Sequence, residues 1–464
     1  MSLEELARYL EPQRIVILGF GLEGHSTYHF LRKLFPDKPL ALADRNAAGL
    51  QSFAQQVQDP HLVLHGGDGY LEACARMDYT LVLKSPGIPL KDVEEFFPRE
   101  RMESQAGLFL KLFRDRVIGI TGTKGKSTTA HLIYRALDAQ GFDAMAVGNM
   151  GKPVLDLVFD DVPERLYVYE MSSHMLEMVS TSPRYAILLN IYQEHLDHYK
   201  SFSDYAEAKL NLLRFQKETD YALVSPNVLE YCQGKLPGKG KSYLFDQHQP
   251  NGREGLFIQE NRMIFHRNGK TYDCGPENLK RKLLGQHNLN NIMACLALLN
   301  ILGVEDNHRA LEVIAGFEGL EHRMEYVGEF SGIHFYNDSI STIPQAAICA
   351  VEAIGNVDTL IIGGLDRGID YHELVDFLAR GHVRNVICLP ATGHRIYEQL
   401  KELPVSSSMN LLRAENMEEA VNGAFAVTRK GMSCLLSPAA ASYGFYRNFE
   451  ERGRVYKELV KTHG

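Results

Sequence analysis

The sequence has 464 residues, which is more than one ordinary hydrophobic core holds, so we expect two to four domains. Hydrophobic residues make up 45% and charged residues 23% of the chain, as in ordinary soluble proteins. The formal net charge of -9 argues against a nucleic-acid partner, whose phosphates favour a basic surface, but it is compatible with small anionic ligands held at a helix N-terminus.

The cysteine spacing and the apolar pattern indicate a soluble protein in a reducing compartment. The seven cysteines contain no CxxC pair, so we expect neither a disulfide framework nor a zinc site. The first residues lack the basic and apolar stretches of a signal peptide, and no run approaches the roughly 18 apolar residues of a membrane helix. We therefore expect a cytoplasmic protein with no membrane partner.

Short apolar runs alternate with helical patterns through most of the chain. Each run is continuous in Val, Ile and Leu, which is typical of strands buried on both faces. The alternation predicts an α/β fold with parallel sheets flanked by helices. The runs expected to be strands are Arg14–Leu18, Tyr79–Leu83, Val117–Ile120, Leu166–Glu170, Ala186–Ile191, Thr359–Ile362, Asn385–Leu389 and Ser433–Leu436.

The positions where these patterns are interrupted predict three domains. We expect a Rossmann-like domain over residues 1–108, a central domain with an ATPase-type parallel sheet over residues 109–318, and a second Rossmann-like domain over residues 319–464. A more polar stretch, Pro237–Cys274, predicts a small antiparallel insertion in the central domain.

The first domain opens on a glycine-rich turn. Gly19, Gly21 and Gly24 have GxGxxG spacing directly after an apolar strand, and Asp44 ends the next apolar run. This pattern is typical of dinucleotide binding and favours an NAD-dependent oxidoreductase when it is considered alone. It is also weak, because any diphosphate can bind at such a helix N-terminus.

The strongest local motif is a second glycine-rich turn, Gly-Thr-Lys-Gly-Lys-Ser-Thr over residues 122–128. An apolar strand precedes it and a helical pattern follows, so its backbone N–H groups can converge on a phosphate. We expect Lys126 to reach the β and γ phosphates of ATP and the Ser127 hydroxyl to bind Mg²⁺. The spacing departs from GxxxxGK[ST], because Ile120 stands where the first glycine is expected.

The shortened loop resembles that of the Mur ligase and folylpolyglutamate ligase superfamily, and further motifs match in the same order along the whole chain. The resemblance implies a Mg²⁺ ligand at Glu170, a metal-binding histidine at His195 in Asn-Ile-Tyr-Gln-Glu-His-Leu-Asp-His, and a carbamylated lysine at Lys209 that orients a second Mg²⁺. Taken singly, a residue such as Glu170 or His195 is usually a solvated strand end or a satisfied core histidine, and Lys209 within a helix is normally a surface lysine. The ATP contacts that the resemblance implies are Gly122, Thr123, Lys124, Gly125, Lys126, Ser127, Thr128, Asn288, Asn291, Arg323 and Asp338.

The first domain narrows the resemblance to the Mur ligases that add D-glutamate, in which a Rossmann-like domain binds uridine diphosphate. Folylpolyglutamate ligases begin at the phosphate loop and lack such a domain, so they fit less well. Lys84-Ser-Pro-Gly-Ile88 and Gly148-Asn-Met-Gly151 also resemble nucleotide-sugar contacts of this family. The implied contacts to the UDP substrate are Gly21, Leu22, Glu23, Asp44, Arg45, Ser85, Pro86, Gly87 and Asn149.

The C-terminal domain carries the motifs that in this family meet the incoming amino acid. Leu435–Gly453 resembles a Ser-Pro-Ala strand end followed by an aromatic helix and an Arg-Gly. The implied amino-acid contacts are Thr342, Arg367, Ser442 and Phe449. Two positions depart from the family pattern, since Ile340 and Arg367 stand where lysines are expected. The departures leave the identity and stereochemistry of the amino acid open.

Together the motifs predict an ATP-dependent, amide-forming ligase of peptidoglycan synthesis. The resemblance implies that D-glutamate is joined to UDP-N-acetylmuramoyl-L-alanine through an acyl phosphate, with ATP, two Mg²⁺ ions and carbamylated Lys209, in a monomer. L-glutamate or another amino acid is an alternative. An NAD-dependent oxidoreductase would leave the phosphate loop and Glu170 unexplained, and a nucleotide-binding protein without chemistry would need no second metal site.

Overall fold

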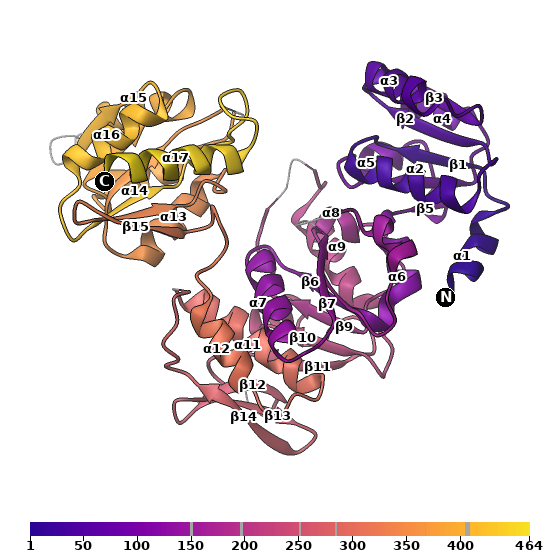
Figure 1. Ribbon diagram of the computed structural model, residues 1–464, viewed down its shortest axis with the longest axis horizontal. Coiled ribbons are helices and arrows are strands. Elements are labelled where there is room, and N and C mark those ends of the chain that lie inside the picture. The colour runs from indigo at the N-terminus through magenta and orange to yellow at the C-terminus, as the bar shows by residue number, and fades with distance from the viewer. Residues whose placement is uncertain (149–151, 195–197, 250–251, 284, 367, 404–408) are drawn as a thin grey trace. The chain divides into compact units, whose positions relative to one another are not determined.

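The computed structural model describes residues 1–148, 152–194, 198–249, 252–283, 285–366, 368–403 and 409–464. The chain divides into two compact units (Figure 1). Unit 1 is Met1–Lys280 with His287–Ala315, and unit 2 is Arg281–Gln286 with Gly316–Gly464. In the described residues, unit 1 contains two β-sheets and unit 2 contains one.

The first sheet of unit 1 has five strands in the order β3-β2-β1-β4-β5, all parallel. The strands are β1 (Ile15–Leu18), β2 (Leu40–Asp44), β3 (Leu62–Gly66), β4 (Leu81–Lys84) and β5 (Met102–Glu103). The accompanying helices are α1 (Leu3–Leu10), α2 (Leu22–Leu34), α3 (Ala47–Val57), α4 (Tyr70–Ala75), α5 (Leu90–Val93) and the 3₁₀ turn η1 (Arg99–Arg101). Every residue of β1 and β4 is buried, as their continuous apolar sequences predict.

The second sheet has nine strands in the order β14-β13-β12-β11-β10-β9-β6-β8-β7. The strands are β6 (Val117–Thr121), β7 (Ala144–Gly148), β8 (Leu166–Glu170), β9 (Tyr185–Leu188), β10 (Tyr221–Val224), β11 (Lys241–Phe245), β12 (Gly255–Gln259), β13 (Arg262–Arg267) and β14 (Lys270–Pro276). The helical segments are α6 (Gln105–Phe113), η2 (Arg114–Arg116), α7 (Lys126–Ala139), η3 (Val154–Asp160), α8 (Ser173–Leu176), α9 (Phe202–Arg214), α10 (Pro226–Tyr231), α11 (Gln286–Ile301) and α12 (His308–Gly316).

The sheet of unit 2 has six strands in the order β15-β16-β20-β17-β18-β19, with only β15 antiparallel to its neighbour among the pairs described. The strands are β15 (Glu325–Phe330), β16 (Ile333–Asn337), β17 (Val357–Ile362), β18 (Asn385–Cys388), β19 (Asn410–Arg413) and β20 (Ser433–Leu436). The helices are α13 (Pro344–Ile354), α14 (His372–Ala379), α15 (Thr392–Lys401), α16 (Met417–Val427) and α17 (Phe449–His463).

The two sheets of unit 1 share one hydrophobic core. Buried side chains of the five-stranded sheet, such as Leu42, belong to the same cluster as Tyr167 and Leu188 of the nine-stranded sheet. Phe30 on α2 packs against Phe159 on η3, with ring centroids 5.6 Å apart. The shared core holds the two sheets of unit 1 together.

The polar stretch expected to form a small antiparallel insertion does contain antiparallel strands, and these continue the nine-stranded sheet. β11 pairs in parallel with β10 and β12, and β12, β13 and β14 then extend the same sheet as antiparallel hairpins. The predicted fold class, α/β with parallel sheets in three parts, is confirmed. Among the described helices, none combines the length and apolar character needed to cross a bilayer.

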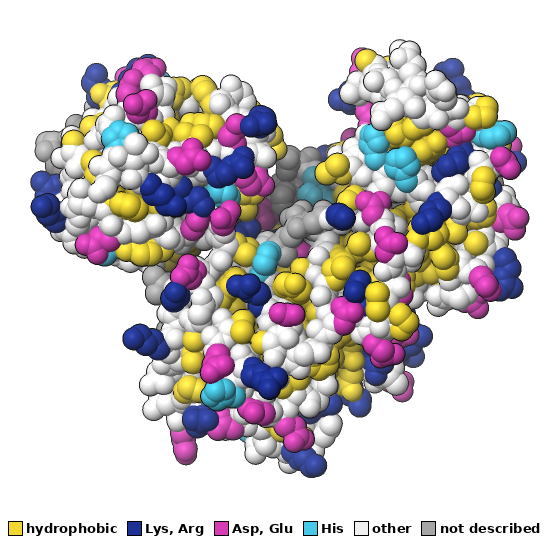
Figure 2. All heavy atoms as spheres, in the orientation of Figure 1, with side chains coloured by type: hydrophobic (Ala, Val, Ile, Leu, Met, Phe, Trp, Pro, Cys, Tyr) yellow, Lys and Arg dark blue, Asp and Glu magenta, His cyan; other side chains and the backbone are white. Residues whose placement is uncertain are grey.

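The surface shows no segregation of charge on the side presented in Figure 2. Lysine and arginine side chains are interspersed with aspartate, glutamate and apolar side chains across this face. Each of the seven cysteines is a free thiol.

Candidate active site

The phosphate loop lies at the carboxyl end of β6, which pairs with β8 and β9 and is the third strand from the β7 edge of the nine-stranded sheet. The carboxyl ends of the strands are where open parallel sheets bind ligands. Gly125 has a φ of +88°, a left-handed conformation that favours glycine, and α7 begins at the next residue. The backbone N–H groups at the start of α7 are thus available to an anion.

Lys126 and Lys209 converge on one backbone oxygen. The carbonyl oxygen of Gly122 accepts hydrogen bonds from Lys126 Nζ at 2.8 Å and from Lys209 Nζ at 2.9 Å. Lys209 is 1% exposed, and burial, followed by the nearby charge of Lys126, lowers its pKa well below the usual value. The phenol ring of Tyr205 lies beside this amine, with the ring centroid 4.7 Å from Nζ. A buried lysine with a lowered pKa is poised to react as a neutral amine.

The loop is braced from the strand end after β9. Thr123 N donates to the carbonyl oxygen of Asn190 at 3.0 Å, and Lys124 N donates to Asn190 Oδ1 at 2.8 Å. Thr123 Oγ1 accepts from Tyr205 Oη at 3.0 Å. Lys124 also forms an ion pair with Glu194 at 2.7 Å. These contacts from Asn190, Tyr205 and Glu194 therefore fix the conformation of the phosphate loop.

Ser127 and Glu170 meet where β8 ends. Ser127 Oγ donates to Glu170 Oε1 at 3.0 Å, and both residues are buried. A hydroxyl in the first turn of α7 and a carboxylate at the end of β8 supply the hard oxygen ligands that Mg²⁺ prefers, so these residues fit the first predicted magnesium site. His195, predicted to hold the second Mg²⁺ with Lys209, lies outside the described residues. The described residues contain no cluster of three or more His, Cys, Asp and Glu side chains that could hold a metal.

Helix α11 places two asparagines against the phosphate loop. Asn291 Nδ2 donates to Asn288 Oδ1 at 2.9 Å, and both side chains are buried. A Cβ atom on Gly125 would lie 2.7 Å from Asn291 Oδ1. The structure therefore brings Asn291 to the loop, next to the predicted ATP contacts, where glycine leaves room for its amide.

The glycine-rich turn of the first sheet is closed by tight backbone contacts. Gly19 has a φ of +86°, and its carbonyl oxygen accepts from Ser85 Oγ at 2.8 Å. A Cβ on Gly24 would lie 2.2 Å from that same oxygen, so only glycine permits α2 to begin so close to β1. Gly21, by contrast, has open space where a Cβ would be, at the N-terminus of α2.

The remaining predicted UDP contacts surround this turn. Asp44 Oδ2 accepts from Phe20 N and Oδ1 from Asn46 N, each at 2.7 Å, so the carboxylate holds two loops together. Burial raises the pKa of Glu23 to about 7, although the charge of Lys84 opposes the shift. Leu22, Arg45 and Gly87 are exposed and Pro86 is half-buried, and Asn149 lies outside the described residues.

In unit 2 the predicted ATP contact Asp338 lies buried at the end of β16. Its carboxylate accepts hydrogen bonds from the hydroxyls of Ser341 and Ser437 and from Met324 N. Burial nevertheless raises its pKa to about 6, and the charge of Arg323 is among the groups that oppose this. Asp338 and Arg323 are therefore neighbours within unit 2.

Three of the four predicted amino-acid contacts lie among the described residues, in the loops that follow β16 and β20 and at the start of α17. Ser442 is buried, and its carbonyl oxygen accepts from Tyr446 N at 3.0 Å. Phe449 begins α17, and its carbonyl oxygen accepts from Ser339 Oγ at 2.8 Å. Thr342 is half-buried in the loop after β16. Arg367 lies outside the described residues.

Sequence reasoning assigned no role to two buried charged groups, although both lie within motifs that it singled out. Arg452 is 1% exposed and donates to Ser339 Oγ, the carbonyl oxygen of Ser339 and that of Ala440, so it ties together the loops that carry the predicted amino-acid contacts. Lys84 ends an apolar strand and forms a buried ion pair with Glu177. The signal for Lys84 was a lysine at the end of an otherwise apolar run, Leu-Val-Leu-Lys.

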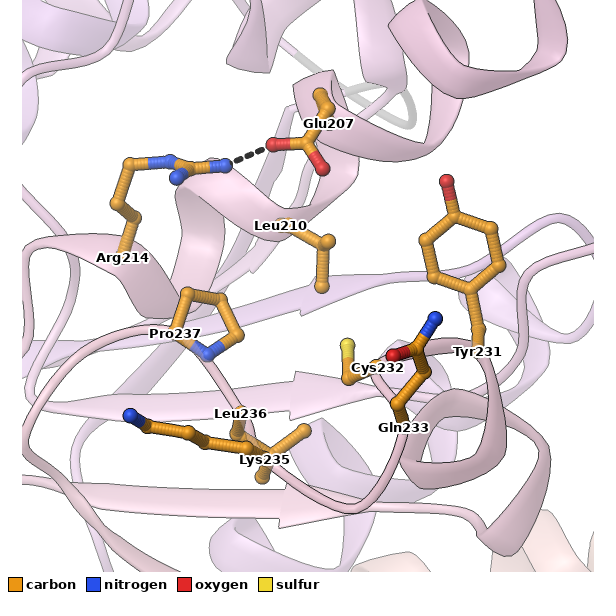
Figure 3. Close-up of a pocket in the computed structure, with 9 residues that line it drawn as sticks. All are labelled: Glu207, Leu210, Arg214, Tyr231, Cys232, Gln233, Lys235, Leu236 and Pro237. Carbon is orange, nitrogen blue, oxygen red and sulfur yellow. Dashed lines mark hydrogen bonds and ion pairs between the residues drawn. The ribbon is translucent and has the colours of Figure 1, made fainter.

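A cavity of about 320 Å³ lies on the other side of α9 and contains none of the predicted site residues (Figure 3). Glu207, Leu210 and Arg214 face it from α9, which is the spacing of one helix face, whereas Lys209 points toward Gly122. In Figure 3 the Cys232 sulfur and the Leu210 side chain point into this space. The cavity is therefore separate from the phosphate loop.

Comparison with known proteins identifies the family. Residues 120–299 match the model of the Mur ligase middle domain. The chain is 32% identical over 456 residues, 97% of this chain and 98% of the relative, to the UDP-N-acetylmuramoylalanine--D-glutamate ligase of Symbiobacterium thermophilum. It is 31% identical over 467 residues, 98% of each chain, to the ligase of the same name from Geobacillus kaustophilus.

Solved structures match the fold over nearly the whole chain. The structure of MurF ligase from Thermotoga maritima in complex with ADP has a TM-score of 0.56 at 16% identity, and the match covers 92% of this chain and 96% of that one. At that identity the likeness concerns the fold. The full-length sequence relatives, together with the matched middle domain, confirm the resemblance drawn from the motifs: this chain belongs to the Mur ligase family.

Proposed function

We propose that this protein uses ATP to join D-glutamate to UDP-N-acetylmuramoyl-L-alanine during peptidoglycan precursor synthesis. The observation that carries the proposal is the extent of the sequence likeness, since the D-glutamate ligase of Symbiobacterium thermophilum matches 97% of this chain, including the first sheet. The phosphate loop with Lys126 and Ser127, and the buried Glu170 beside it, support a reaction that consumes ATP. ATP and the nucleotide sugar are cytoplasmic metabolites, so we place the reaction in the cytoplasm.

The proposed reaction has two steps. A carboxylate oxygen of the L-alanyl group attacks the γ-phosphorus of ATP, the bond from that phosphorus to the bridging oxygen breaks, and ADP leaves. The glutamate amine then attacks the acyl carbon, forming the C–N bond. Phosphate leaves with the C–O electron pair and the nitrogen loses a proton. Because the first step brings two anions together, the site must neutralise charge and align the reactants.

The residues of the phosphate loop would divide this task. Lys126, which now donates to the Gly122 carbonyl oxygen, would turn to the γ-phosphate, and the N–H groups at the start of α7 would hold the phosphates. Mg²⁺ held by Ser127 and Glu170 would neutralise charge on the phosphates. A carbamate on Lys209 would add an anion close to Lys126, where a second Mg²⁺ with His195 completes the predicted site.

The remaining predicted contacts take their roles from the family. We propose that Gly21, Ser85 and their neighbours bind the uridine diphosphate and that Asn288 and Asn291 meet the adenine. Ser442 and Phe449 would position the glutamate. These assignments rest on motif positions and on the neighbourhoods described above.

L-glutamate is a second candidate substrate, and Ile340 is the observation that favours it. This residue follows Asp338 and Ser339 at the end of β16, where the family pattern has a lysine. Its backbone N–H donates to the carbonyl oxygen of His322 at 3.1 Å, which fixes the backbone of the loop that leads to Thr342. The absence of a lysine at this position changes how a carboxylate of the incoming amino acid is bound.

The test is phosphate release from ATP with UDP-N-acetylmuramoyl-L-alanine and D-glutamate, L-glutamate or lysine in separate reactions. Release that requires both the nucleotide sugar and D-glutamate supports the proposal. Release only with L-glutamate assigns the second candidate. If protein that binds ATP releases no phosphate with any of these amino acids, the proposed substrate is contradicted.

A further inference from the structure

A buried ion pair links the two sheets of unit 1. Lys84, at the end of β4, is 2% exposed, and its Nζ lies 3.1 Å from Glu177 Oε2 in the segment after α8. The same amine donates to the carbonyl oxygens of Ser85 at 3.2 Å and Ile88 at 2.7 Å. Lys84 therefore fixes both ends of the loop over residues 85–88, which we call the β4 loop.

The Glu177 carboxylate also holds a second partner. Glu177 Oε1 accepts from, or pairs with, His198 Nε2 at 2.7 Å, and the His198 side chain is 11% exposed. Burial raises the pKa of Glu177, but the hydrogen bond from His198 and the charge of Lys84 outweigh it and hold the pKa below its usual value. Glu177 is thus a carboxylate that joins the β4 loop to the segment leading into α9.

The same region is connected to Lys209 through helix packing. Leu176, the last residue of α8, accepts a hydrogen bond at its carbonyl oxygen from Asn211 Nδ2 on α9, at 3.0 Å. Lys209 lies on α9, less than one turn from Asn211. A continuous set of contacts therefore runs from the β4 loop through Lys84 and Glu177 to the helix that carries Lys209.

The packing of the two sheets of unit 1 against each other does not require the Lys84–Glu177 ion pair. The junction already contains the Phe30–Phe159 contact and the buried Gln105 side chain, which donates to Thr27 Oγ1 at 3.2 Å and accepts from Val154 N at 3.2 Å. Buried ion pairs are often no more stabilising than apolar side chains of the same size. What the pair adds is directional contact between two particular loops.

We propose that Glu177 is a positioning residue, which holds the β4 loop in register with α9 so that the acceptor carboxylate reaches the phosphate loop. The identity of that acceptor rests on the function proposed above, whereas the positioning of the loop does not. Removing the charge takes away the ion-pair partner of Lys84, whose bonds to the Ser85 and Ile88 carbonyl oxygens remain, and so releases the β4 loop from the segment after α8. The nucleotide sugar then binds in a wider range of poses, and misplacement by about 1 Å can cost on the order of 10²-fold in rate.

The first test compares Glu177→Gln with Lys200→Gln. Lys200 forms an exposed pair with Glu94, at 3.7 Å, between the same two parts of unit 1, so its removal is a matched control. We expect Glu177→Gln to raise the KM for UDP-N-acetylmuramoyl-L-alanine about tenfold or more and to change the KM for ATP less than about twofold. The control keeps both values. Wild-type KM and kcat in folded Glu177→Gln would overturn the inference.

The second test measures amide hydrogen exchange and needs no substrate. Ser85 N donates to the Leu18 carbonyl oxygen at 2.8 Å and Ile88 N to that of Ser85 at 3.3 Å. We expect both amides to exchange faster in Glu177→Gln and to be unchanged in Lys200→Gln. If Glu177→Gln does not fold, the double variant Lys84→Met/Glu177→Gln, which leaves no unpaired charge, must show the same faster exchange. Unchanged exchange overturns the positioning role, whereas a wild-type enzyme without turnover contradicts only the proposed function.

Discussion

Lys209 donates its amine to the carbonyl oxygen of Gly122 at 2.9 Å, although the two residues are 87 positions apart. The same oxygen accepts from Lys126, so two lysines that would both be cations in water share one acceptor. Burial and the neighbouring charge lower the pKa of Lys209 well below its usual value. A neutral amine is the form that takes up CO₂, which connects this contact to the predicted carbamate.

Removal of the Lys209 amine is expected to abolish ligation. Lys209→Ala and Lys209→Arg should each lower kcat by on the order of 10²-fold or more, because neither side chain forms a carbamate. Bicarbonate should restore activity to CO₂-depleted wild-type enzyme and leave both variants inactive. The measurement is phosphate release at fixed pH with and without bicarbonate. Near-normal turnover in Lys209→Ala would exclude a carbamate role.

Glu170→Gln is expected to weaken the use of magnesium and to keep the fold. The amide retains the shape of the carboxylate and a hydrogen bond with Ser127 but removes the negative charge. We expect kcat to fall by on the order of 10²-fold and the Mg²⁺ concentration needed for half-maximal rate to rise. Glu207→Gln, which alters an exposed acid on α9, serves as the control. Equal magnesium dependence in the two variants would contradict the assignment.

Gly125→Ala tests the fit between the phosphate loop and Asn291. The new Cβ would lie 2.7 Å from Asn291 Oδ1 in a residue whose φ is +88°. Gly141→Ala is the matched control, because Gly141 has a φ of +85° and open space around its Cβ position. Both variants should lose about 1 kcal/mol of stability from backbone strain. Only Gly125→Ala should lose ATP binding, as measured by calorimetry, and equal ATP affinity in the two would refute the loop's role.

The pKa of Glu23 predicts a specific pH dependence of stability. Its folded-state pKa is about 7 against an ordinary 4.5, so the folded state binds the proton more tightly. The contribution to stability is therefore complete below pH 4.5 and is lost as the pH rises through 7, up to about 3 kcal/mol in total. Glu23→Gln should remove this loss. The difference in unfolding free energy between variant and wild type, measured in urea, should increase from pH 5 to pH 8, and a constant difference would contradict the pKa.

Ile340→Lys is expected to change the use of the amino acid without changing the use of ATP. A lysine at this half-buried position would bring a cation to the loop between Asp338 and Thr342. A charge-assisted hydrogen bond is worth about 1.5–3 kcal/mol, so the KM for glutamate should change about tenfold or more. The ratio of kcat/KM for D- and L-glutamate is the quantity to measure. If neither this ratio nor the KM for glutamate changes, Ile340 does not determine which amino acid is used.

The sequence was most informative where structure is local. The runs Val117–Ile120 and Leu166–Glu170 predicted β6 and β8 within one residue, because continuous apolar stretches are typical of strands buried on both faces. The phosphate loop was likewise predictable from its own glycines, because they permit the turn between β6 and α7. The order of β12, β13 and β14 was not predicted, since the pairing of hairpins with a sheet edge depends on distant partners.

Long-range side-chain contacts account for most of what the sequence left out. No spacing rule connects Lys84 with Glu177, or Arg452 with Ser339, because each pair meets only after the sheets have packed. The roles of Asn288 and Asn291 came from a resemblance, and the structure adds that Asn291 lies against Gly125.

The position of β6 in its sheet also has a consequence for how the protein is made. β6 is an apolar interior strand, third from the β7 edge of the sheet, and its neighbour β9 follows it in sequence only after β7 and β8. A chain emerging from the ribosome therefore presents one open edge of β6 until β9 has been synthesised. Unpaired apolar strand edges promote aggregation. We expect chains truncated before β9 to be insoluble and to depend on chaperones, while chains that include α11 can complete the phosphate loop.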